Sequence, residues 1–295
     1  MLRAIRIAIA VLIGIAAGSA VLAENAFHVW NHNPAMPASA QAIARQGAAS
    51  WHAAGIAAGD GVPLKAWIFT PQQSNGAAVI LLHGVADTRM GMSGHAPYLL
   101  RAGYTVLLPD SRGHGESGGS IISYGVRESG DIHRWADLML HEPGVGRLYG
   151  LGQSMGAAIL IESLAAEPRF RALVADCPFA TFEEIAYDRL AQRGLASRMA
   201  AWPLIHFGVL YGRARYGIDL WRASPADSIR ATHIPVLLIH GAADDNIPPR
   251  HSRTLHALNP AVSELWEVPR AGHIASLMTE PEAYRQRVLD WFSRY

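Results

Sequence analysis

Apolar runs that alternate with helical stretches are the feature that most constrains how this chain can fold. Bounded by turn residues, the runs recur at Ala77–Leu82, Thr105–Leu108, Leu148–Leu151, Ala172–Ala175, Val236–Ile239 and Leu265–Val268. Helical stretches lie among them at Ser93–Ala102, Arg127–His141, Met155–Ala166 and Pro249–Leu258, and a last helix opens near Pro281. Mostly apolar strands that alternate with helices predict an α/β protein with a mostly parallel sheet covered on both faces.

A hairpin is predicted to precede these six strands and to bring the sheet to eight. Ala53–Ala58 and Leu64–Phe69 flank a turn-rich stretch that begins Gly59-Asp60-Gly61. The chain has 295 residues, 50% of them hydrophobic, which is enough for one large core or two small ones. We expect residues 51–295 to form one domain around the sheet.

The N-terminus predicts a targeting or anchoring segment. Arg3 and Arg6 precede an uncharged stretch, Ile7–Ala23, that would span ~26 Å as a helix, slightly less than the roughly 30 Å hydrocarbon core of a membrane. Val21-Leu22-Ala23 offers small residues at the positions that a signal peptidase reads. Residues 1–23 are therefore a signal peptide or a short membrane anchor. Both keep the arginines in the cytoplasm and place the rest of the chain outside it, either free or anchored to the inner membrane.

Residues 24–50 show no sustained periodicity and are expected to form a linker, with one short helix around Ala38–Arg45. The region before Trp51 contains no motif residue, and its apolar helix has no place in a sheet-centred core. We expect this region to be dispensable for folding and catalysis.

Composition excludes several classes of function. The net charge is +1, only 17% of residues are charged, and no long run of like charge provides the basic face of a nucleic-acid binder. Cys177 is the only cysteine, so an internal disulfide or a cysteine-rich metal site is not expected. The histidines form no helical metal motif, and we expect neither a metal nor a cofactor. The oligomeric state is not indicated.

The strongest chemical signal is Gly152-Gln153-Ser154-Met155-Gly156, which follows one apolar run and opens a helix. A sharp turn from strand to helix strains the central serine and requires small residues two positions to either side. The turn raises the Ser154 hydroxyl above the sheet edge and places the Met155 amide at a helix N-terminus, where it can bind an oxyanion. The similar Gly115-Glu116-Ser117-Gly118-Gly119 lacks this context, because no strand leads into Ser117 and no helix follows it.

Three more signals lie at strand ends. Leu82-His83-Gly84-Val85 can supply a second oxyanion donor, the Val85 amide, whereas His83 precedes Ser154 in the chain and is interpreted as structural. Asp244 follows a buried strand, and His273 follows the last one. The order serine, acid, histidine, each at the carboxyl end of a strand, is what a catalytic triad on such a sheet requires.

These motifs together resemble those of the α/β-hydrolase superfamily over roughly residues 50–295. The resemblance rests on His83-Gly84, on Asp110-Ser111-Arg112-Gly113-His114-Gly115, on the GQSMG segment, on HGAADDNIP and on Ala271-Gly272-His273. Within the superfamily the chain is similar to bacterial lysophospholipase-like and fermentation–respiration-switch-like serine hydrolases, including relatives labelled serine aminopeptidases. The family's nucleophile, acid and base map to Ser154, Asp244 and His273, and its oxyanion donors map to Val85 and Met155. The substrate does not carry over.

The resemblance implies an eight-stranded α/β-hydrolase fold and cleavage of a small acyl ester through an acyl-enzyme. Asp245 and Asp176 remain alternatives to Asp244 as the acid. A peptidase or an acyltransferase with the same triad is the first alternative function, and a non-catalytic envelope binding protein is the second. Besides its acyl ester substrate, the protein is expected to associate with a membrane through the N-terminal segment.

A long insertion interrupts the alternation after the sixth strand. Roughly sixty residues separate that strand from Pro235, far more than an ordinary connection. We expect residues 180–225 to form a helical cap in which Trp202, Phe207 and Tyr211 line an acyl pocket. The alternative is a pair of helices that packs at the sheet edge with no catalytic role.

Overall fold

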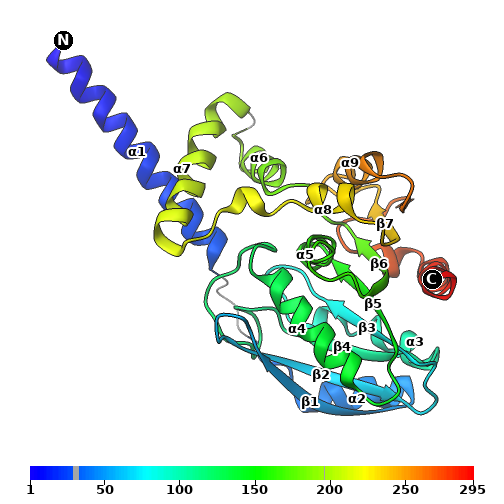
Figure 1. Cartoon of the computed structure of the whole chain (residues 1–295). Helices are drawn as coiled ribbons and strands as arrows, with labels where there is room; N and C mark the ends of the chain where they lie inside the picture. The colour runs from blue at the N-terminus through cyan, green and yellow to red at the C-terminus, as the bar shows by residue number, and fades with distance from the viewer. Residues whose placement is uncertain (29–32, 196) are drawn as a thin grey trace.

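The computed structural model describes residues 1–28, 33–195 and 197–295. Its centre is an eight-stranded sheet in the order β1-β2-β4-β3-β5-β6-β7-β8 (Figure 1). The strands β1 and β2 pair antiparallel, as do β2 and β4, and all other neighbours pair parallel. The strand bounds are β1 Ala49–Ala57, β2 Pro63–Pro71, β3 Ala77–Leu82, β4 Thr105–Pro109, β5 Arg147–Gln153, β6 Phe170–Asp176, β7 Val236–Gly241 and β8 Ser263–Val268. The expected eight-stranded, mostly parallel sheet is confirmed.

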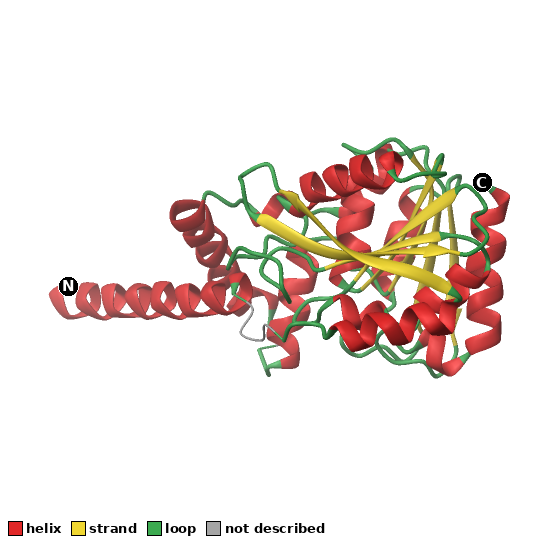
Figure 2. Ribbon diagram, turned by 90° about the horizontal axis from the view of Figure 1, so that it is seen from below, coloured by secondary structure: helices red, strands yellow, loops and turns green. Residues whose placement is uncertain are grey.

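Helices cover both faces of the sheet, which explains why the central strands are apolar throughout (Figure 2). Side chains of β3 alternate between two core clusters, with Ile80 in one and Val79 in the other. The helices α4 (Glu128–His141), α5 (Met155–Ser163), α8 (Pro225–Ala231) and α9 (Arg250–Leu258) pack into the first cluster. The helices α2 (Pro37–Gly47), α3 (Ala96–Arg101) and α11 (Pro281–Arg294) pack into the second. Three short helical segments are η1 (Arg89–Met92), η2 (Leu220–Arg222) and α10 (Ser276–Thr279).

The expected linker over residues 24–50 is corrected by the structure. Helix α2 falls where one short helix was expected, but its buried Ala40, Ile43 and Ala44 belong to the second core cluster. Strand β1 begins at Ala49, before Trp51. The folded domain therefore begins earlier than predicted, because the outer antiparallel strands need a helix to cover their apolar face. Residues 29–32 lie outside the described residues.

The insertion between β6 and β7 is helical and stands away from the sheet. It contains α6 (Phe182–Gln192) and α7 (Arg198–Tyr216), and it leads through η2 into α8. In Figure 1, α7 lies alongside a long N-terminal helix, α1 (Leu2–Phe27). The first part of α1 projects away from the rest of the molecule (Figure 2). Among the described residues, α1 is the one helix long and apolar enough to cross a membrane.

Candidate active site

Ser154 sits on the sharp turn that joins β5 to α5. Its backbone has φ 55° and ψ −121°, a strained conformation for a residue with a side chain. A Cβ atom on Gly152 would lie 2.6 Å from the carbonyl carbon of Gly156, and one on Gly156 would lie 2.3 Å from the carbonyl oxygen of Leu82. The small neighbours in GQSMG are therefore required by close backbone contacts on both sides of the serine.

Two loops at the same sheet edge bring an acid and a histidine to Ser154. Asp244 lies three residues after β7 and His273 five residues after β8. The imidazole of His273 makes a contact of 2.9 Å from Nε2 to the Ser154 Oγ and one of 2.7 Å from Nδ1 to Asp244 Oδ2. The three residues that the sequence singled out thus form one continuous hydrogen-bonded chain across 119 positions of sequence.

Asp244 is buried and held as a carboxylate. Its Oδ1 accepts hydrogen bonds of 2.9 Å from the amides of Asn246 and Ile247. Burial by itself would raise the pKa of Asp244, but hydrogen bonds from His240, His273 and the Ile247 amide outweigh it, so the pKa lies below the usual range. A carboxyl that stays ionised can orient His273 and stabilise an imidazolium.

The two alternative acids, Asp245 and Asp176, lie in environments that differ from that of Asp244. Asp245 is exposed next to the buried Asp244. Asp176 is fully buried, and its carboxylate accepts a hydrogen bond of 3.2 Å from the hydroxyl of Tyr284. Burial raises the pKa of Asp176, which is the opposite of the shift at Asp244.

The other candidate motif residues brace loops. Ser117 Oγ donates to the carbonyl of Asp110 at 2.7 Å and accepts from the amide of Lys65 at 2.9 Å. His83 is buried and its Nε2 accepts a hydrogen bond of 3.0 Å from the amide of Ser111. Ser117 thus ties the loop after β4 to strand β2, and His83 ties the loop after β3 to the loop after β4.

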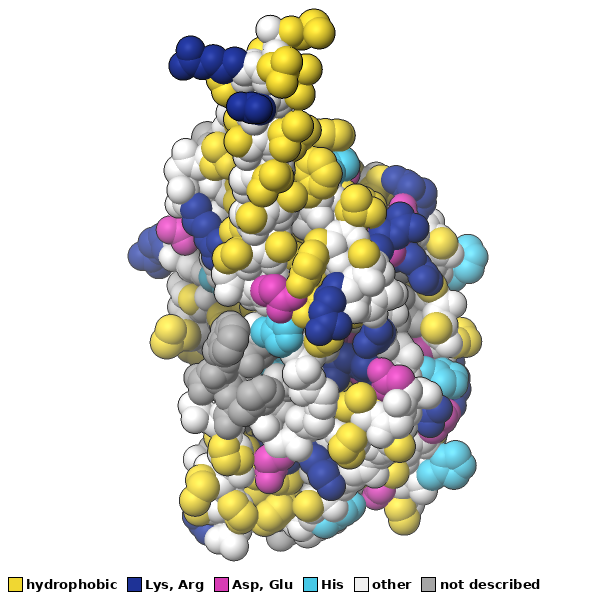
Figure 3. All heavy atoms as spheres, turned by 90° about the vertical axis from the view of Figure 1, so that its left-hand side faces the viewer, with side chains coloured by type: hydrophobic (Ala, Val, Ile, Leu, Met, Phe, Trp, Pro, Cys, Tyr) yellow, Lys and Arg dark blue, Asp and Glu magenta, His cyan; other side chains and the backbone are white. Residues whose placement is uncertain are grey.

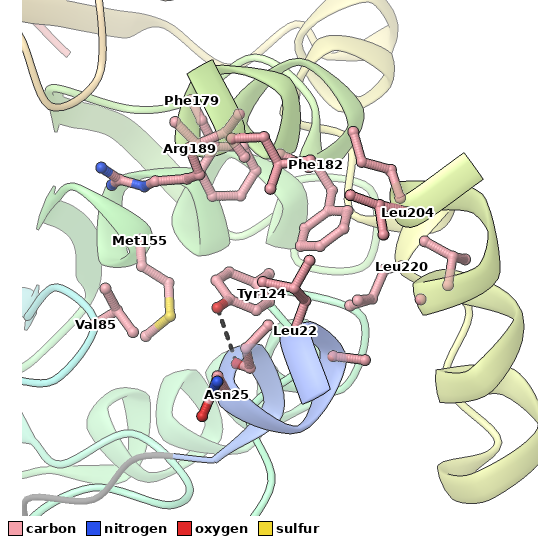
Figure 4. Close-up of a pocket in the computed structure, with 18 of the residues that line it drawn as sticks. Leu22, Asn25, Val85, Tyr124, Met155, Phe179, Phe182, Arg189, Leu204 and Leu220 are labelled. Atoms are coloured by element: carbon pink, nitrogen blue, oxygen red, sulfur yellow. Dashed lines mark hydrogen bonds between the residues drawn. The ribbon is translucent and has the colours of Figure 1, made fainter. Parts of the chain in front are cut away.

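Val85 and Met155, the expected oxyanion donors, lie beside Ser154 on the wall of one pocket. Figure 4 shows their side chains next to each other at one end of the pocket. A Cβ atom on Gly84 would lie only 3.2 Å from the Cβ of Ser154, so the backbone before Val85 passes directly against the serine. The amides of Val85 and Met155 stay the predicted oxyanion donors.

The pocket has a volume of about 240 Å³ and a largely apolar lining. Its floor is formed by Ser154 with Val85 and Met155, and its side by α6. We use the term roof for α7 together with residues 19–27 of α1, which both contribute to the pocket wall. The lining residues of the roof are Ser19, Leu22, Ala23, Asn25, Ala26, Leu204, Ile205, Gly208 and Val209.

The insertion contributes to the pocket, but through residues other than those expected. Trp202 is 53% exposed and stacks on His206, and Phe207 is also exposed. The Tyr211 hydroxyl donates to Glu24 on α1. None of the three is among the lining residues, because Leu204, Ile205 and Val209 occupy the inward face of α7 instead. The aromatic residues indicated that α7 contributes to the pocket, but they did not indicate which side of α7 faces it.

The packing of α1 argues against the expectation that the region before Trp51 is dispensable. Five residues of α1 line the pocket, and Phe27 is fully buried between α1 and α7. The sequence contained a signal for this packing: Gly208 and Gly212 are four residues apart on α7, a spacing that permits close approach of two helices.

His240 is a site residue that sequence reasoning quoted within a motif but gave no role. It is fully buried at the end of β7, and its Nε2 lies 2.8 Å from the carbonyl oxygen of Ile247 and 3.3 Å from Asp244 Oδ2. Its Nδ1 lies 2.7 Å from the hydroxyl of Ser252 on α9. His240 therefore supports the turn that carries the acid.

One group of potential metal ligands overlaps this site. Atoms of Cys177, Asp244 and His273 lie within 4.8 Å of one another. Burial raises the pKa of the Cys177 thiol well above its usual range, so the thiolate needed for a metal is disfavoured. Asp244 and His273 are already bonded to each other. This donor set is poorly suited to a metal and well suited to moving a proton from Ser154.

Known proteins share both the sequence pattern and the fold. The family described as serine aminopeptidase, S33, matches residues 73–210. The uncharacterized protein YqkD of Bacillus subtilis is 30% identical over 217 residues, which are 72% of this chain and 70% of YqkD. The uncharacterized protein YfhR of Escherichia coli K12 is 27% identical over 244 residues, 79% of this chain and 77% of YfhR.

Solved structures share the fold at lower identity. An esterase of Pyrococcus furiosus superposes with a TM-score of 0.69 at 24% identity, covering 85% of this chain and 95% of the esterase. The esterase RhEst1 of Rhodococcus superposes with a TM-score of 0.59 at 20% identity, covering 82% of this chain and 98% of the esterase. With the sheet order, the Ser154 turn and these relatives taken together, the chain belongs to the α/β-hydrolase superfamily and is a serine hydrolase of that fold.

Proposed function

We propose that this protein is a carboxylic ester hydrolase in which Ser154, His273 and Asp244 act as nucleophile, base and orienting acid. The observation that carries the proposal is the hydrogen-bonded chain from Asp244 through His273 to the Ser154 hydroxyl, which opens into an apolar pocket. The solved structures named as esterases share the fold and support the same class of reaction.

The mechanism follows from this geometry. His273 Nε2 takes the proton of Ser154 as its Oγ attacks the acyl carbon, and Asp244 stabilises the resulting imidazolium. The amides of Val85 and Met155 bind the negative oxygen of the tetrahedral intermediate. The imidazolium then protonates the leaving alcohol as the C–O bond breaks. Water, deprotonated by His273, cleaves the acyl-Ser154 ester and releases the carboxylic acid.

The pocket lining favours an acyl group over the amino terminus of a peptide. An aminopeptidase has to bind a positively charged α-amino group near its nucleophile, and a carboxylate is the side chain suited to that. The described residues that line the pocket include Arg189 and Arg193 but no aspartate or glutamate. A peptidase function therefore receives less support than ester hydrolysis.

The test compares p-nitrophenyl esters with aminoacyl p-nitroanilides and adds a fluorophosphonate label. We expect turnover of the esters, little turnover of the anilides, and covalent labelling of Ser154 that is absent in Ser154→Ala. Preferred cleavage of anilides would replace the proposal with a peptidase, and preferred transfer to an added alcohol would replace it with an acyltransferase. No labelling and no turnover would indicate a binding protein.

A further inference from the structure

The last turns of α1 are built into the fold. Ser19, Ala23 and Phe27, spaced four residues apart, are buried along one side of the helix. This side meets Gly208 and Gly212 of α7: a Cβ atom on Gly208 would lie 3.5 Å from the Ser19 carbonyl oxygen, and one on Gly212 would lie 2.6 Å from the Phe27 ring. The two helices therefore pack closely and run in the same direction.

Polar contacts hold this part of α1 as well. The carboxylate of Glu24 accepts hydrogen bonds from the hydroxyls of Tyr211 and Tyr216, at 2.5 and 2.6 Å. The Tyr124 hydroxyl donates to the Ala26 carbonyl at 2.9 Å, the bond drawn in Figure 4. These contacts tie α1 to α7 and to the loop before α4, so its last turns are held from two sides.

The side of α1 next to this contact faces the pocket. Leu22, Asn25 and Ala26 line the cavity, and Figure 4 shows Leu22 and Asn25 rising from α1 at its lower edge. Cleavage after Ala23, where the sequence offers a signal-peptidase site, would remove Leu22 and Ala23 from the pocket wall. It would also uncover part of the apolar face of α7, because Ala23 shares one core cluster with Val209.

The rest of α1 is apolar and bare. An 18-residue window of the helix has a mean hydropathy of 2.3, and only 6% of it is buried. Hydrophobic side chains cover the projecting helix in Figure 3, with the arginines near its tip. The segment Leu2–Gly18 would span ~26 Å, slightly less than the hydrocarbon core of a membrane. Such a difference is accommodated when the bilayer thins locally or when long side chains such as Arg3 and Arg6 extend to the membrane surface. A bilayer is the environment that fits this surface.

The beginning of α7 lies beside the same stretch of helix. Gly18 faces Leu204, so the preceding turn of α7 is level with the part of α1 just before Gly18. That turn exposes Met199 and Trp202, which are 87% and 53% accessible. A tryptophan at such a level is typical of the boundary between membrane and water. The roof of the pocket is therefore continuous with the surface that enters the bilayer.

We propose that α1 is retained in the mature protein as a membrane anchor and that its residues 19–26 select the acyl chain, so that the enzyme draws single acyl chains of membrane lipids along the apolar surface of the roof to Ser154. The substrate class rests on the proposed ester hydrolysis, whereas retention of α1 does not. An acyl chain that passes along an apolar helix from the bilayer avoids exposure to water, which would slow transfer about fourfold for each exposed methylene.

The first test examines retention. Full-length chain is expressed in a bacterium with an inner membrane, recovered from the membrane fraction and analysed by intact mass. We expect a chain that still contains residues 1–23. A mature protein that begins at Glu24 would overturn the proposal whatever its catalytic activity.

The second test examines chain selection in the full-length protein. Leu22→Trp should fill the pocket and reduce the ratio of kcat/KM for decanoyl over acetyl esters by roughly tenfold or more, the loss of a few buried methylenes. Leu22→Ala should shift the preference toward longer chains. The matched control is Val21→Trp, one position along the helix and 61% exposed, which should leave the ratio unchanged.

Labelling of Ser154 by a short fluorophosphonate separates the possible failures. If the wild type is labelled and the three variants give the same acyl profile, the ester hydrolase stands and the role of α1 in selection is wrong. If the wild type is neither labelled nor active on any ester, the proposed function fails and chain selection fails with it.

The third test examines the source of the substrate. The same long-chain monoacyl ester is supplied in phosphatidylcholine vesicles and as dissolved monomer to protein reconstituted in those vesicles. Ile13→Asp, which puts a charge on the projecting helix, should reduce the ratio of vesicle to monomer rates by about tenfold or more relative to Ile13→Leu. Equal ratios in the two variants would show that the substrate reaches Ser154 from water.

Discussion

The floor of the pocket and its roof are built on opposite principles. The floor rests on the hydrogen-bonded chain of Ser154, His273 and Asp244, which follow paired strands whose register and backbone contacts leave little freedom. The roof is two helices from distant parts of the chain that meet through Gly208, Gly212 and a few hydrogen bonds. Proton transfer and nucleophilic attack depend on distances of about 3 Å and therefore need a rigid floor, whereas selection of an acyl chain needs only a pocket of the right shape.

This contrast predicts that changes in the floor abolish turnover and changes in the roof alter selectivity or stability. The largest expected effect is from Ser154→Ala, which should reduce ester turnover by at least about 10⁴-fold because no acyl-enzyme forms. The variant should unfold at the wild-type temperature or above, since the strained turn loses only an oxygen. Ser117→Ala is the matched control, and loss of activity there instead would move the nucleophile.

Asp244→Asn should lower kcat by about 10³–10⁴-fold, because His273 loses the partner that holds its tautomer. Asp245→Asn, one residue away and exposed, should change kcat by less than about threefold, within the range of neutral surface changes. Steady-state kinetics on an acetyl ester measure both. A larger loss in Asp245→Asn or Asp176→Asn would assign the acid to that residue.

His240→Ala should have an intermediate effect, of roughly tenfold to a hundredfold on kcat, because the turn that carries Asp244 loses its support below the floor. Since His240 is outside the pocket lining, KM for short esters should change little. The control is His256→Ala on α9, which removes a histidine whose Nδ1 lies 2.9 Å from Ser263 Oγ. An equal loss in both variants would mean a general loss of packing.

In the roof, Gly212→Ala should destabilise the fold by about 1–3 kcal/mol, since the new methyl group meets the ring of Phe27. Acetyl-ester turnover at 25 °C should stay within about twofold, because the floor is untouched. Gly130→Ala on α4, where a Cβ atom meets nothing within 4 Å, should instead stabilise by about 0.5–1 kcal/mol. Thermal unfolding of both proteins distinguishes a close helix contact from a loose one.

The smallest effect on turnover is expected from Glu162 on α5. Its side chain is buried against Gly125, in the loop before α4, and one of its carboxylate oxygens has no partner among the described residues. Burial, followed by the charge of Glu128, raises the pKa of Glu162 well above the usual range. The folded protein thus keeps a proton that the unfolded chain releases, and this contribution to stability is lost as pH rises above the ordinary glutamate pKa. Glu162→Gln should therefore gain stability relative to wild type between pH 5 and pH 8 in urea unfolding, with acetyl-ester turnover retained. A constant difference across that range would show that Glu162 is ionised in the fold.

Local sequence was sufficient to predict the site wherever a single backbone requirement dictates the residue type. The tight approaches at Gly152 and Gly156 restrict those positions to glycine, so the motif around Ser154 could be interpreted before the structure was known. It was insufficient where partners are distant in the chain. Asp244 lies next to Asp245, and only the hydrogen bond to His273 distinguishes them. His240 acts through contacts with Ile247 and Ser252 that no spacing rule reveals.

The sequence by itself determined the sheet, its helical layers and the positions of the candidate nucleophile and base, because alternating apolar runs and strand-end loops are properties of short segments. Only the tertiary structure decided which face of α7 meets the pocket and that α1 completes it. A helix with apolar residues on several sides does not indicate its buried face until a partner covers it. That partner, Phe27 with its neighbours, comes from about 180 residues earlier in the chain, beyond the reach of any local pattern.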